Sequence, residues 1–251
     1  MSRADGRRAD QLRPTEIIRG FTETAPGSVL ICQGRTRVLC TACWESGVPE
    51  FLAGAGRGWV TAEYDMLPSS TGQRRRRRGR NGKVDGRSQE IQRLIGRTMR
   101  SIIDMSKLGE NTVWLDCDVL QADGGTRTAA ITGAYVALAD GLSWARKQKL
   151  IKENPLAGAI AAVSVGIVGG KVLLDLDYGE DSAADVDMNV AMTGAGEFVE
   201  VQGSAEGGTF GREQLDKMLR VAAKGIRELL ANQKKTLRKE FTTKKRKESR
   251  I

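Results

Sequence analysis

The chain contains no histidine, and this absence removes a large part of enzyme chemistry. None of its 251 residues carries an imidazole. Imidazole is the most common general acid and base and is central to Ser-His-Asp and Cys-His catalysis. We therefore exclude these nucleophilic mechanisms, histidine zinc sites and nucleases that transfer protons through imidazole.

Cysteine is scarce, and its pattern does not favour a metal site. The four cysteines are Cys32, Cys40, Cys43 and Cys117. Cys40 and Cys43 form a CxxC pattern, but they lie within residues 37–44, which resemble a buried strand. A spacing of three places two side chains on opposite faces of a strand. We interpret all four as reduced thiols that behave as small core residues.

Long apolar stretches are also missing. No run of residues approaches the 18 consecutive apolar side chains that a membrane-spanning helix needs. Residues 1–14 are polar and charged and lack the apolar segment of a secretory signal. We therefore expect no membrane span and a cytoplasmic protein.

Positive charge is abundant and is concentrated in two places. The net charge is +9. Residues 74–80 hold six arginines and no acid, and residues 233–251 hold nine Lys or Arg and two Glu, so the rest of the chain is slightly acidic. Such segments favour a polyanionic partner, most often nucleic acid. For the C-terminal segment, a solvated tail without a partner is the alternative.

The pattern of apolar residues predicts alternating strands and helices. β-branched and aromatic runs between glycine or proline turns predict strands at 16–24, 28–32, 36–44, 58–67, 111–120, 156–168, 171–177, 185–192 and 198–203. Helical spacing predicts helices at 87–107, 126–147 and 211–232. A strand-rich start, followed by helices between strands and hairpins, is typical of α+β or mixed α/β layers.

Residues 123–127, Asp-Gly-Gly-Thr-Arg, form a candidate anion site between a predicted strand and a predicted helix. The two glycines let the backbone approach a ligand. N–H groups at the helix start and the Thr126 hydroxyl can donate to phosphate oxygens, and Arg127 adds a charged guanidinium. An ordinary turn with a helix N-cap explains these residues equally well.

Residues 180–187 hold four acidic side chains in eight positions. Clustered carboxylates are poor core material because an unpaired buried charge is costly. They either face solvent or hold a cation, and the residues alone favour a solvated loop. A cation bound only by oxygen atoms at a phosphate site would be Mg²⁺ or Mn²⁺.

Five sequence blocks resemble those of the ribonuclease PH family and occur in the same order. They are GWVTAEY at 58–64, QEIQRLIGR at 89–97, LDCDVLQADGGTRT at 115–128, DLDYGEDSAADVDMNV at 175–190 and VQG at 201–203. The similarity extends from Arg3 to about Leu237. It implies an α+β fold of the β-α-β-α type with mixed sheets and packed helices. Residues 1–236 would form the catalytic domain, and 237–251 a basic C-terminal extension.

The resemblance assigns inorganic phosphate, a co-substrate, to Arg87, Gly125, Thr126 and Arg127. The family usually has two glycines before the first of these arginines, and in this chain the earlier of the two is replaced by Asp85. The arginine itself is kept.

The resemblance also assigns a role to two residues of the acidic run. Asp181 and Asp187 match a pair of aspartates, six residues apart, that binds a divalent metal and supports catalysis. Mg²⁺ or Mn²⁺ is therefore the expected metal. Asp177 and Asp185 are weaker candidates.

The arginine-rich loop corresponds to a family segment whose scattered arginines hold tRNA. Arg74 and Arg77 fall where family arginines usually fall, whereas Ser69 replaces the arginine that commonly follows the loop's proline. Arginine-rich segments bind phosphate backbones with little sequence preference. A merely solvated loop is the alternative. The predicted RNA-binding residues are Arg74, Arg75, Arg76, Arg77, Arg78 and Arg80.

Together these resemblances imply a phosphate-dependent 3′-to-5′ exoribonuclease, a tRNA nucleotidyltransferase. It would trim tRNA precursors, release nucleoside 5′-diphosphates and assemble as a homo-hexameric ring, a trimer of dimers. The main alternative is a non-catalytic RNA-binding ring subunit of an exosome-like assembly, but such subunits lose the Gly-Thr-Arg motif or the aspartate pair. A polynucleotide phosphorylase half needs a duplicated core that 251 residues cannot hold. A basic RNA-binding protein without catalysis would leave the site residues unexplained.

Overall fold

The first half of the chain is built around a five-stranded sheet. The computed structural model describes residues 3–76 and 85–238. The sheet has the order β1-β2-β3-β5-β4, and only β4 and β5 pair in parallel. Its strands are β1 (Thr15–Arg19), β2 (Gly27–Gln33), β3 (Thr36–Ser46), β4 (Trp59–Met66) and β5 (Asn111–Gln121). A short 3₁₀ turn, Glu50–Leu52, lies between β3 and β4.

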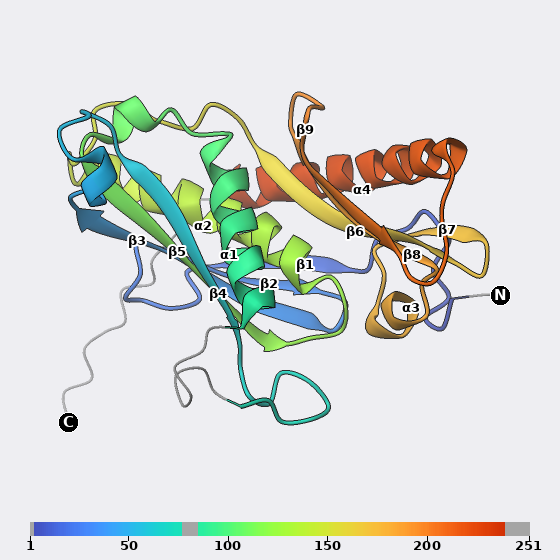
Figure 1. Cartoon of the computed structure of the whole chain (residues 1–251). Helices are drawn as coiled ribbons and strands as arrows, with labels where there is room; N and C mark the ends of the chain where they lie inside the picture. The colour runs from blue at the N-terminus through green and yellow to red at the C-terminus, as the bar shows by residue number, and fades with distance from the viewer. Residues whose placement is uncertain (1–2, 77–84, 239–251) are drawn as a thin grey trace, which may run out of the picture.

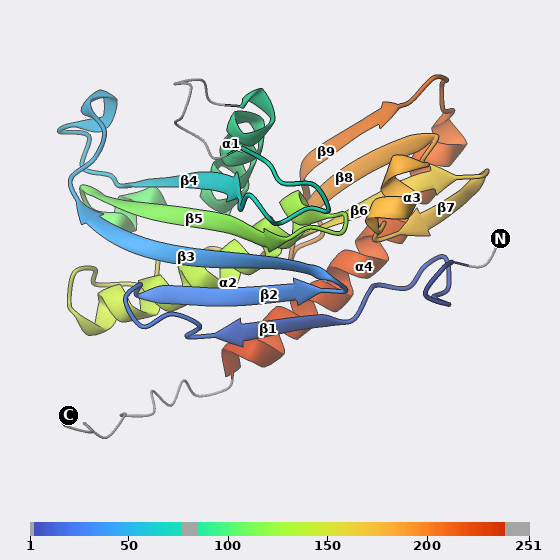
Figure 2. The same cartoon turned by 90° about the horizontal axis from the view of Figure 1, so that it is seen from below.

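Two helices cover one face of this sheet (Figures 1 and 2). Helix α1 (Gly86–Arg100) is amphipathic and packs its apolar face against β4. Helix α2 (Thr126–Lys147) is rich in alanine and apolar on most sides. A helix that is apolar all round belongs in an interior, and α2 contacts β2 and β3 of this sheet as well as β6 of the second half.

The second half is an antiparallel sheet of order β7-β6-β8-β9. Its strands are β6 (Ile160–Val168), β7 (Lys171–Leu174), β8 (Val186–Thr193) and β9 (Phe198–Ala205). Helix α4 (Arg212–Arg238) packs along this sheet and also reaches β1 and α2, while the five-residue helix α3 (Tyr178–Ser182) connects β7 to β8. Figure 1 shows α3 beside the ends of β7 and β8.

The two halves are joined where α2, β6 and α4 meet. The buried Gln233 side chain on α4 donates from Nε2 to the carbonyl oxygens of Thr132 (2.9 Å) and Ile160 (3.0 Å). The Thr132 hydroxyl in turn accepts from the backbone N–H of Ala162. These hydrogen bonds tie α4 to α2 and to β6, and α2 to β6.

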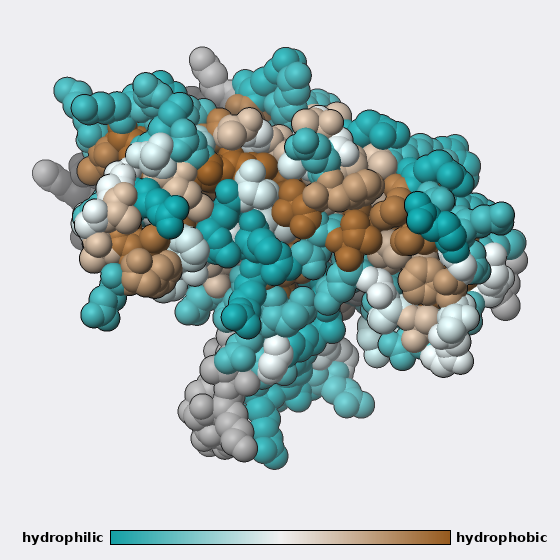
Figure 3. All heavy atoms as spheres, turned by 45° about the horizontal axis from the view of Figure 1, so that its top comes forward, coloured by the Kyte–Doolittle hydropathy of each residue, from teal (hydrophilic) through white to brown (hydrophobic). Residues whose placement is uncertain are grey.

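The surface carries several separate apolar groups among polar ones, as the face in Figure 3 shows. The exposed large apolar side chains are Ile18, Phe21, Phe51, Leu150, Tyr178, Phe198 and Val201. Within residues 3–76 and 85–238, none of the helices has both the length and the apolar character needed to cross a bilayer.

The structure confirms the α+β fold class and corrects several predicted boundaries. The helix predicted at 87–107 was too long: α1 ends at Arg100, and the chain then forms a separate 3₁₀ turn at Met105–Leu108 that Asp104 caps. The strand predicted from residue 156 begins only at Ile160. Helix α4 continues to Arg238, six residues beyond the predicted end at 232.

The cysteines lie as the strand pattern predicted. On β3, Cys40 points into the core and Cys43 lies on the other, partly exposed face. Cys40 faces Cys117 across β3 and β5, and all four thiols are free. The hydrogen bond with Cys40 and burial in the core raise the pKa of Cys117 well above its usual range. The Cys117 thiol therefore stays protonated and unreactive.

Helix α2 can approach β2 closely because glycine lies at the contact. A Cβ atom placed on Gly27 would lie 1.9 Å from the carbonyl oxygen of Ala137, an impossible distance. On the helix side, a Cβ atom on Gly133 would lie 2.8 Å from Ile31 Cγ2. Because glycine lies on both sides of the contact, α2 packs directly against the sheet. This close packing fixes the position of its first turn.

We expect Gly27→Ala to destabilise the protein by about 3 kcal/mol, because the added methyl group meets backbone that cannot move without shifting α2. Urea unfolding followed by circular dichroism measures this. Gly208→Ala is the control, since its Cβ atom would meet nothing within 4 Å, and its unfolding midpoint should match that of the parent. If Gly27→Ala and Gly208→Ala unfold alike, the close packing of α2 on β2 is wrong.

Candidate active site

The turn between β5 and α2 is a two-glycine loop with a conformation that other residues avoid. Gly124 and Gly125 have φ values of 74° and 65°. A Cβ atom at Gly124 would also lie 2.6 Å from the carbonyl oxygen of Leu176. Glycine is therefore required both for backbone conformation and for space. The loop ends at the first turn of α2, whose backbone N–H groups have no acceptor within the helix and can bind an anion.

Thr126, the first residue of α2, is oriented from β4. The Tyr64 hydroxyl donates to Thr126 Oγ1 at 2.8 Å, and both side chains are buried. Burial raises the pKa of Tyr64, so the phenol stays protonated and remains a donor. Because Oγ1 accepts this bond, the Thr126 hydroxyl hydrogen is left to donate to another group.

Two arginines converge on this loop from the starts of two helices. Arg127 on α2 donates to Oε1 of Gln202 on β9 and lies 3.4 Å from the Glu90 carboxylate on α1. Arg87, in the first turn of α1, is exposed. The charges of Arg87 and Arg127 both lower the pKa of Tyr64 and that of Asp181, so both guanidinium groups lie within electrostatic range of these two side chains.

The carboxylates of Asp181 and Asp187 come from the second half of the chain. Asp181 lies on α3, and Asp187 lies on β8, where Oδ1 accepts from the Ser204 hydroxyl at 3.0 Å. Desolvation by burial raises the pKa of Asp181, and repulsion from Asp187 raises it further. The positive charges of the nearby arginines oppose this shift.

The structure therefore brings together residues that are far apart in the sequence. Arg87, Thr126 and Arg127 come from the first half, and Asp181 and Asp187 from the second. Among residues 3–76 and 85–238, no group of three or more His, Cys, Asp or Glu side chains could hold a metal ion by itself. Any metal held by the two carboxylates would take further ligands from water or substrate, as Mg²⁺ commonly does.

The two weaker acidic candidates make other contacts. Asp177 caps α3: its side chain accepts from the Glu180 N–H at 2.9 Å, while the Glu180 carboxylate accepts from the Asp177 N–H. Asp185 is exposed, and its backbone N–H binds the carbonyl oxygen of Ile167. The acidic run is thus partly a capped helix that its sequence did not predict.

The described part of the arginine loop is tied to the start of α1. Arg75 lies 3.4 Å from the Asp85 carboxylate, and Asp85 is the N-cap of α1 and accepts from the Arg87 N–H. Arg74 and Arg76 are exposed. The other predicted RNA-binding residues lie outside the described residues: Arg77, Arg78 and Arg80.

Sequence reasoning missed three neighbours of the predicted residues. Tyr64 orients Thr126, and Glu90 and Gln202 hold Arg127. Each lies inside one of the blocks that carry the resemblance, which was the available signal, but nothing in the spacing of the blocks predicts these contacts.

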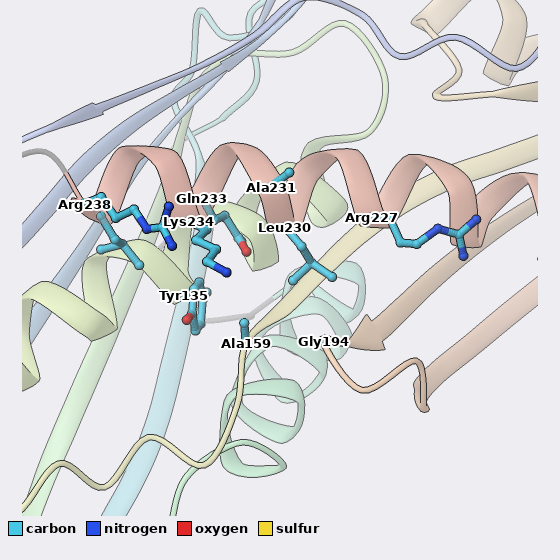
Figure 4. Close-up of a pocket in the computed structure, with 10 residues that line it drawn as sticks. Tyr135, Ala159, Gly194, Arg227, Leu230, Ala231, Gln233, Lys234 and Arg238 are labelled. Carbon is cyan, nitrogen blue, oxygen red and sulfur yellow. The ribbon is translucent and has the colours of Figure 1, made fainter.

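A pocket separate from the predicted site residues lies between α2, α4 and the start of β6 (Figure 4). Its volume is about 580 Å³, and none of the predicted site residues lines it. Its lining contains basic side chains but no carboxylate, and it lacks the two-glycine loop that precedes α2. Its walls include Tyr135, Ala159, Leu230, Gln233 and Leu237.

Comparison with known proteins identifies the family. Residues 11–141 match domain 1 of the 3′ exoribonuclease family, and residues 158–225 match domain 2. The chain belongs to this family.

Named relatives agree along almost the whole chain. Ribonuclease PH of Corynebacterium kroppenstedtii is 57% identical over 239 residues, which are 95% of this chain and 94% of the relative. Ribonuclease PH of Corynebacterium efficiens is 58% identical over 236 residues, 94% and 96% of the two chains.

Solved structures agree with the fold. The chain resembles a structure described as the exosome of Archaeoglobus fulgidus with RNA bound to the active site: TM-score 0.78, 26% identity, 92% of each chain covered. An archaeal exosome core matches with a TM-score of 0.76 at 26% identity, covering 93% of this chain and 91% of the other.

These matches confirm two predictions for this member of the 3′ exoribonuclease family. It has the ribonuclease PH type of α+β fold, and it is a phosphate-dependent 3′-to-5′ exoribonuclease. Its two family domains correspond to the two sheets, and the candidate site lies where those sheets meet.

Proposed function

We propose that this exoribonuclease trims the 3′ ends of tRNA precursors in the cytoplasm and works as a homo-hexameric ring, a trimer of dimers. The observation that carries the catalytic part is the convergence of Arg87, Thr126 and Arg127 with Asp181 and Asp187. Its resemblance to solved structures described as exosomes supports assembly into a ring.

Inorganic phosphate binds, in this proposal, at the start of α2. Gly125 lets the backbone approach the anion, the Thr126 hydroxyl donates to it, and Arg87 and Arg127 neutralise its charge. Arg127 is held in place by Gln202 and Glu90 before any ligand binds, so little side-chain entropy remains to be lost on binding.

The bound phosphate then attacks the last phosphodiester of the RNA in line. One of its oxygens forms a bond to the terminal phosphorus, the bond from that phosphorus to the 3′ oxygen of the preceding nucleotide breaks, and a nucleoside 5′-diphosphate leaves. The departing 3′ oxygen takes up a proton. Phosphate is itself an anionic nucleophile, so no histidine base is needed, and catalysis rests on positioning and charge neutralisation. The phosphodiester bond is exchanged for the phosphoanhydride bond of the nucleoside diphosphate, a bond of comparable energy, so the reaction is reversible.

Mg²⁺ or Mn²⁺ would be held by the carboxylate oxygens of Asp181 and Asp187. The donor set fits, because both ligands are hard oxygens and because Asp187 raises the pKa of Asp181, a repulsion that a bound cation relieves. A bound metal supplies positive charge to the phosphate oxygens during transfer. The chain's own contribution is to hold both carboxylates beside the two arginines.

RNA shortening should require inorganic phosphate and release nucleoside diphosphates. The assay uses a tRNA with a 3′ extension, incubated with and without phosphate, and identifies the products by chromatography. Excess nucleoside diphosphate without phosphate should extend the 3′ end, because the step is reversible. Release of nucleoside monophosphates without phosphate would contradict the proposal.

Asp181→Asn and Asp187→Asn should each lower kcat by about 100-fold or more, since a metal ligand contributes several kcal/mol to the transition state. RNA affinity and assembly should be preserved. Asp185→Asn is the matched control, because it removes an exposed carboxylate of the same acidic run that is not one of the two proposed metal ligands. Near-normal turnover of both site variants in limiting Mg²⁺ would argue against a metal there.

The arginine loop is proposed to follow the tRNA backbone. Replacing five of its arginines with serine should weaken tRNA binding and lower the log–log salt slope by about 0.7 to 0.9 per lost phosphate contact. Turnover of a saturating short oligonucleotide should change little. Arg75 is kept, because it pairs with the N-cap Asp85 beside Arg87. The replaced residues are Arg74, Arg76, Arg77, Arg78 and Arg80.

A matched control replaces the four basic residues at 244–247 in the C-terminal extension with serine. If the loop variant keeps the parental tRNA affinity and salt slope, the loop is a solvated surface and RNA capture lies elsewhere. If only the tail variant loses affinity, the extension is the RNA-binding segment.

A further inference from the structure

Arg13 is a buried arginine in the segment that precedes β1. Its side chain is 3% exposed, and its Nη2 atom donates to Asp175 Oδ1 at 2.6 Å. The backbone N–H of Arg13 donates to the other oxygen of the same carboxylate at 2.8 Å. Asp175 is fully buried at the end of β7 and has a φ of 55°, a strained value for a residue with a side chain. Both groups are thus fixed by one another.

The other edge of the Arg13 guanidinium holds the two-glycine loop. Nη1 donates to the carbonyl oxygen of Asp123 at 2.5 Å, and Nη2 approaches that of Gly124 at 3.5 Å. A Cβ atom on Gly125 would lie 2.8 Å from Nη2, so the side chain fills the space behind the loop. A single guanidinium therefore joins the loop at the start of α2 to the end of β7.

Two further arginines of the same segment hold α3. Arg3 donates from Nε and Nη2 to the two oxygens of Glu180, at 2.7 and 2.6 Å. Arg7 lies 3.6 Å from that carboxylate, and both arginines donate to the carbonyl oxygen of Asp175 at 3.0 Å. Both are buried. Figure 2 shows the N-terminal segment passing beside β7 and α3.

Helix α3 cannot hold its own position. It has five residues and none of them is buried, and isolated helices this short are not stable in water. Its contacts with Arg3 and Arg7 therefore decide where the next residue, Asp181, is placed. Removing one member of a buried ion pair is strongly destabilising because it leaves an unpaired buried charge, and both carboxylate oxygens of Asp175 accept hydrogen bonds from Arg13.

We propose that residues 3–13 are a positioning element of the active site, in which Arg13 fixes the phosphate-binding loop and Arg3 fixes the metal-binding carboxylate of Asp181. These arginines touch neither substrate nor metal and act through the groups that do. The proposal rests on the proposed roles of Thr126 and Asp181. It adds that the spacing between the two binding sites is set by a segment more than 100 residues before either.

The test uses conservative variants of the full-length protein. Arg13→Lys keeps the charge and can still pair with Asp175, but one ammonium group cannot reproduce the planar fork that also reaches Asp123. We expect the KM for phosphate to rise about tenfold or more, because displaced binding groups lose much of their effect. The KM for RNA should stay unchanged. Direct calorimetric titration with phosphate should show the same loss without turnover.

Arg3→Lys should separate the effect on the metal site from the effect on the phosphate site. Its loss of bidentate contact with Glu180 should loosen α3, so the Mg²⁺ concentration for half-maximal rate and the calorimetric Mn²⁺ affinity should change about tenfold. The KM for phosphate should change much less than in Arg13→Lys. This split between phosphate and metal is not expected from a general loss of stability.

Arg19→Lys is the matched control for stability. Arg19 forms an ion pair of similar length, 2.5 Å, with Asp140 toward the far end of α2. It should lower Tm as much as Arg13→Lys while leaving phosphate and Mn²⁺ affinity at the parental values. If Arg13→Lys and Arg3→Lys only lower Tm, as Arg19→Lys does, the positioning proposal is overturned. Failure of the parent protein to need phosphate would instead overturn the proposed function.

Discussion

Close backbone contact at Gly124 is the constraint on which the site depends. The loop before α2 can lie against the chain at Leu176 only because residue 124 has no side chain. That contact brings the first half of the chain, with its helix start, next to α3 and the acidic residues of the second half. Any larger residue would separate the two groups of charges that must meet.

The arrangement of charge follows from the reactants. Phosphate and a phosphodiester are both anionic, so an enzyme that joins them must supply positive charge that offsets the repulsion between the two reactants. The charges of Arg87 and Arg127 lower the pKa of Asp181, against the repulsion from Asp187 that raises it. A chain without histidine loses nothing in this chemistry, because the nucleophile arrives already charged.

The Asp85 side chain connects the arginine loop to the first turn of α1. Asp85 replaces a glycine usual in the family, yet the structure uses it as the N-cap of the helix that carries Arg87. The same carboxylate pairs with Arg75 of the arginine loop. Carboxylates at helix starts are favourable, so the substitution stabilises the first turn of α1 and holds one end of the loop near it.

The sequence by itself determined the family and the fold class, because five blocks of residues resemble the family and occur in the same order, and the same resemblance supplied the candidate residues. Boundaries such as the early end of α1 at Arg100 depended on capping, and the short helix α3 lacks any apolar periodicity to reveal it. Only the tertiary structure decided that Arg13 supports the two-glycine loop, because its partners are contributed by strands and turns 110 and 162 residues away. The spacing of residues along the chain does not predict such contacts, because they form only when the two sheets pack around α2.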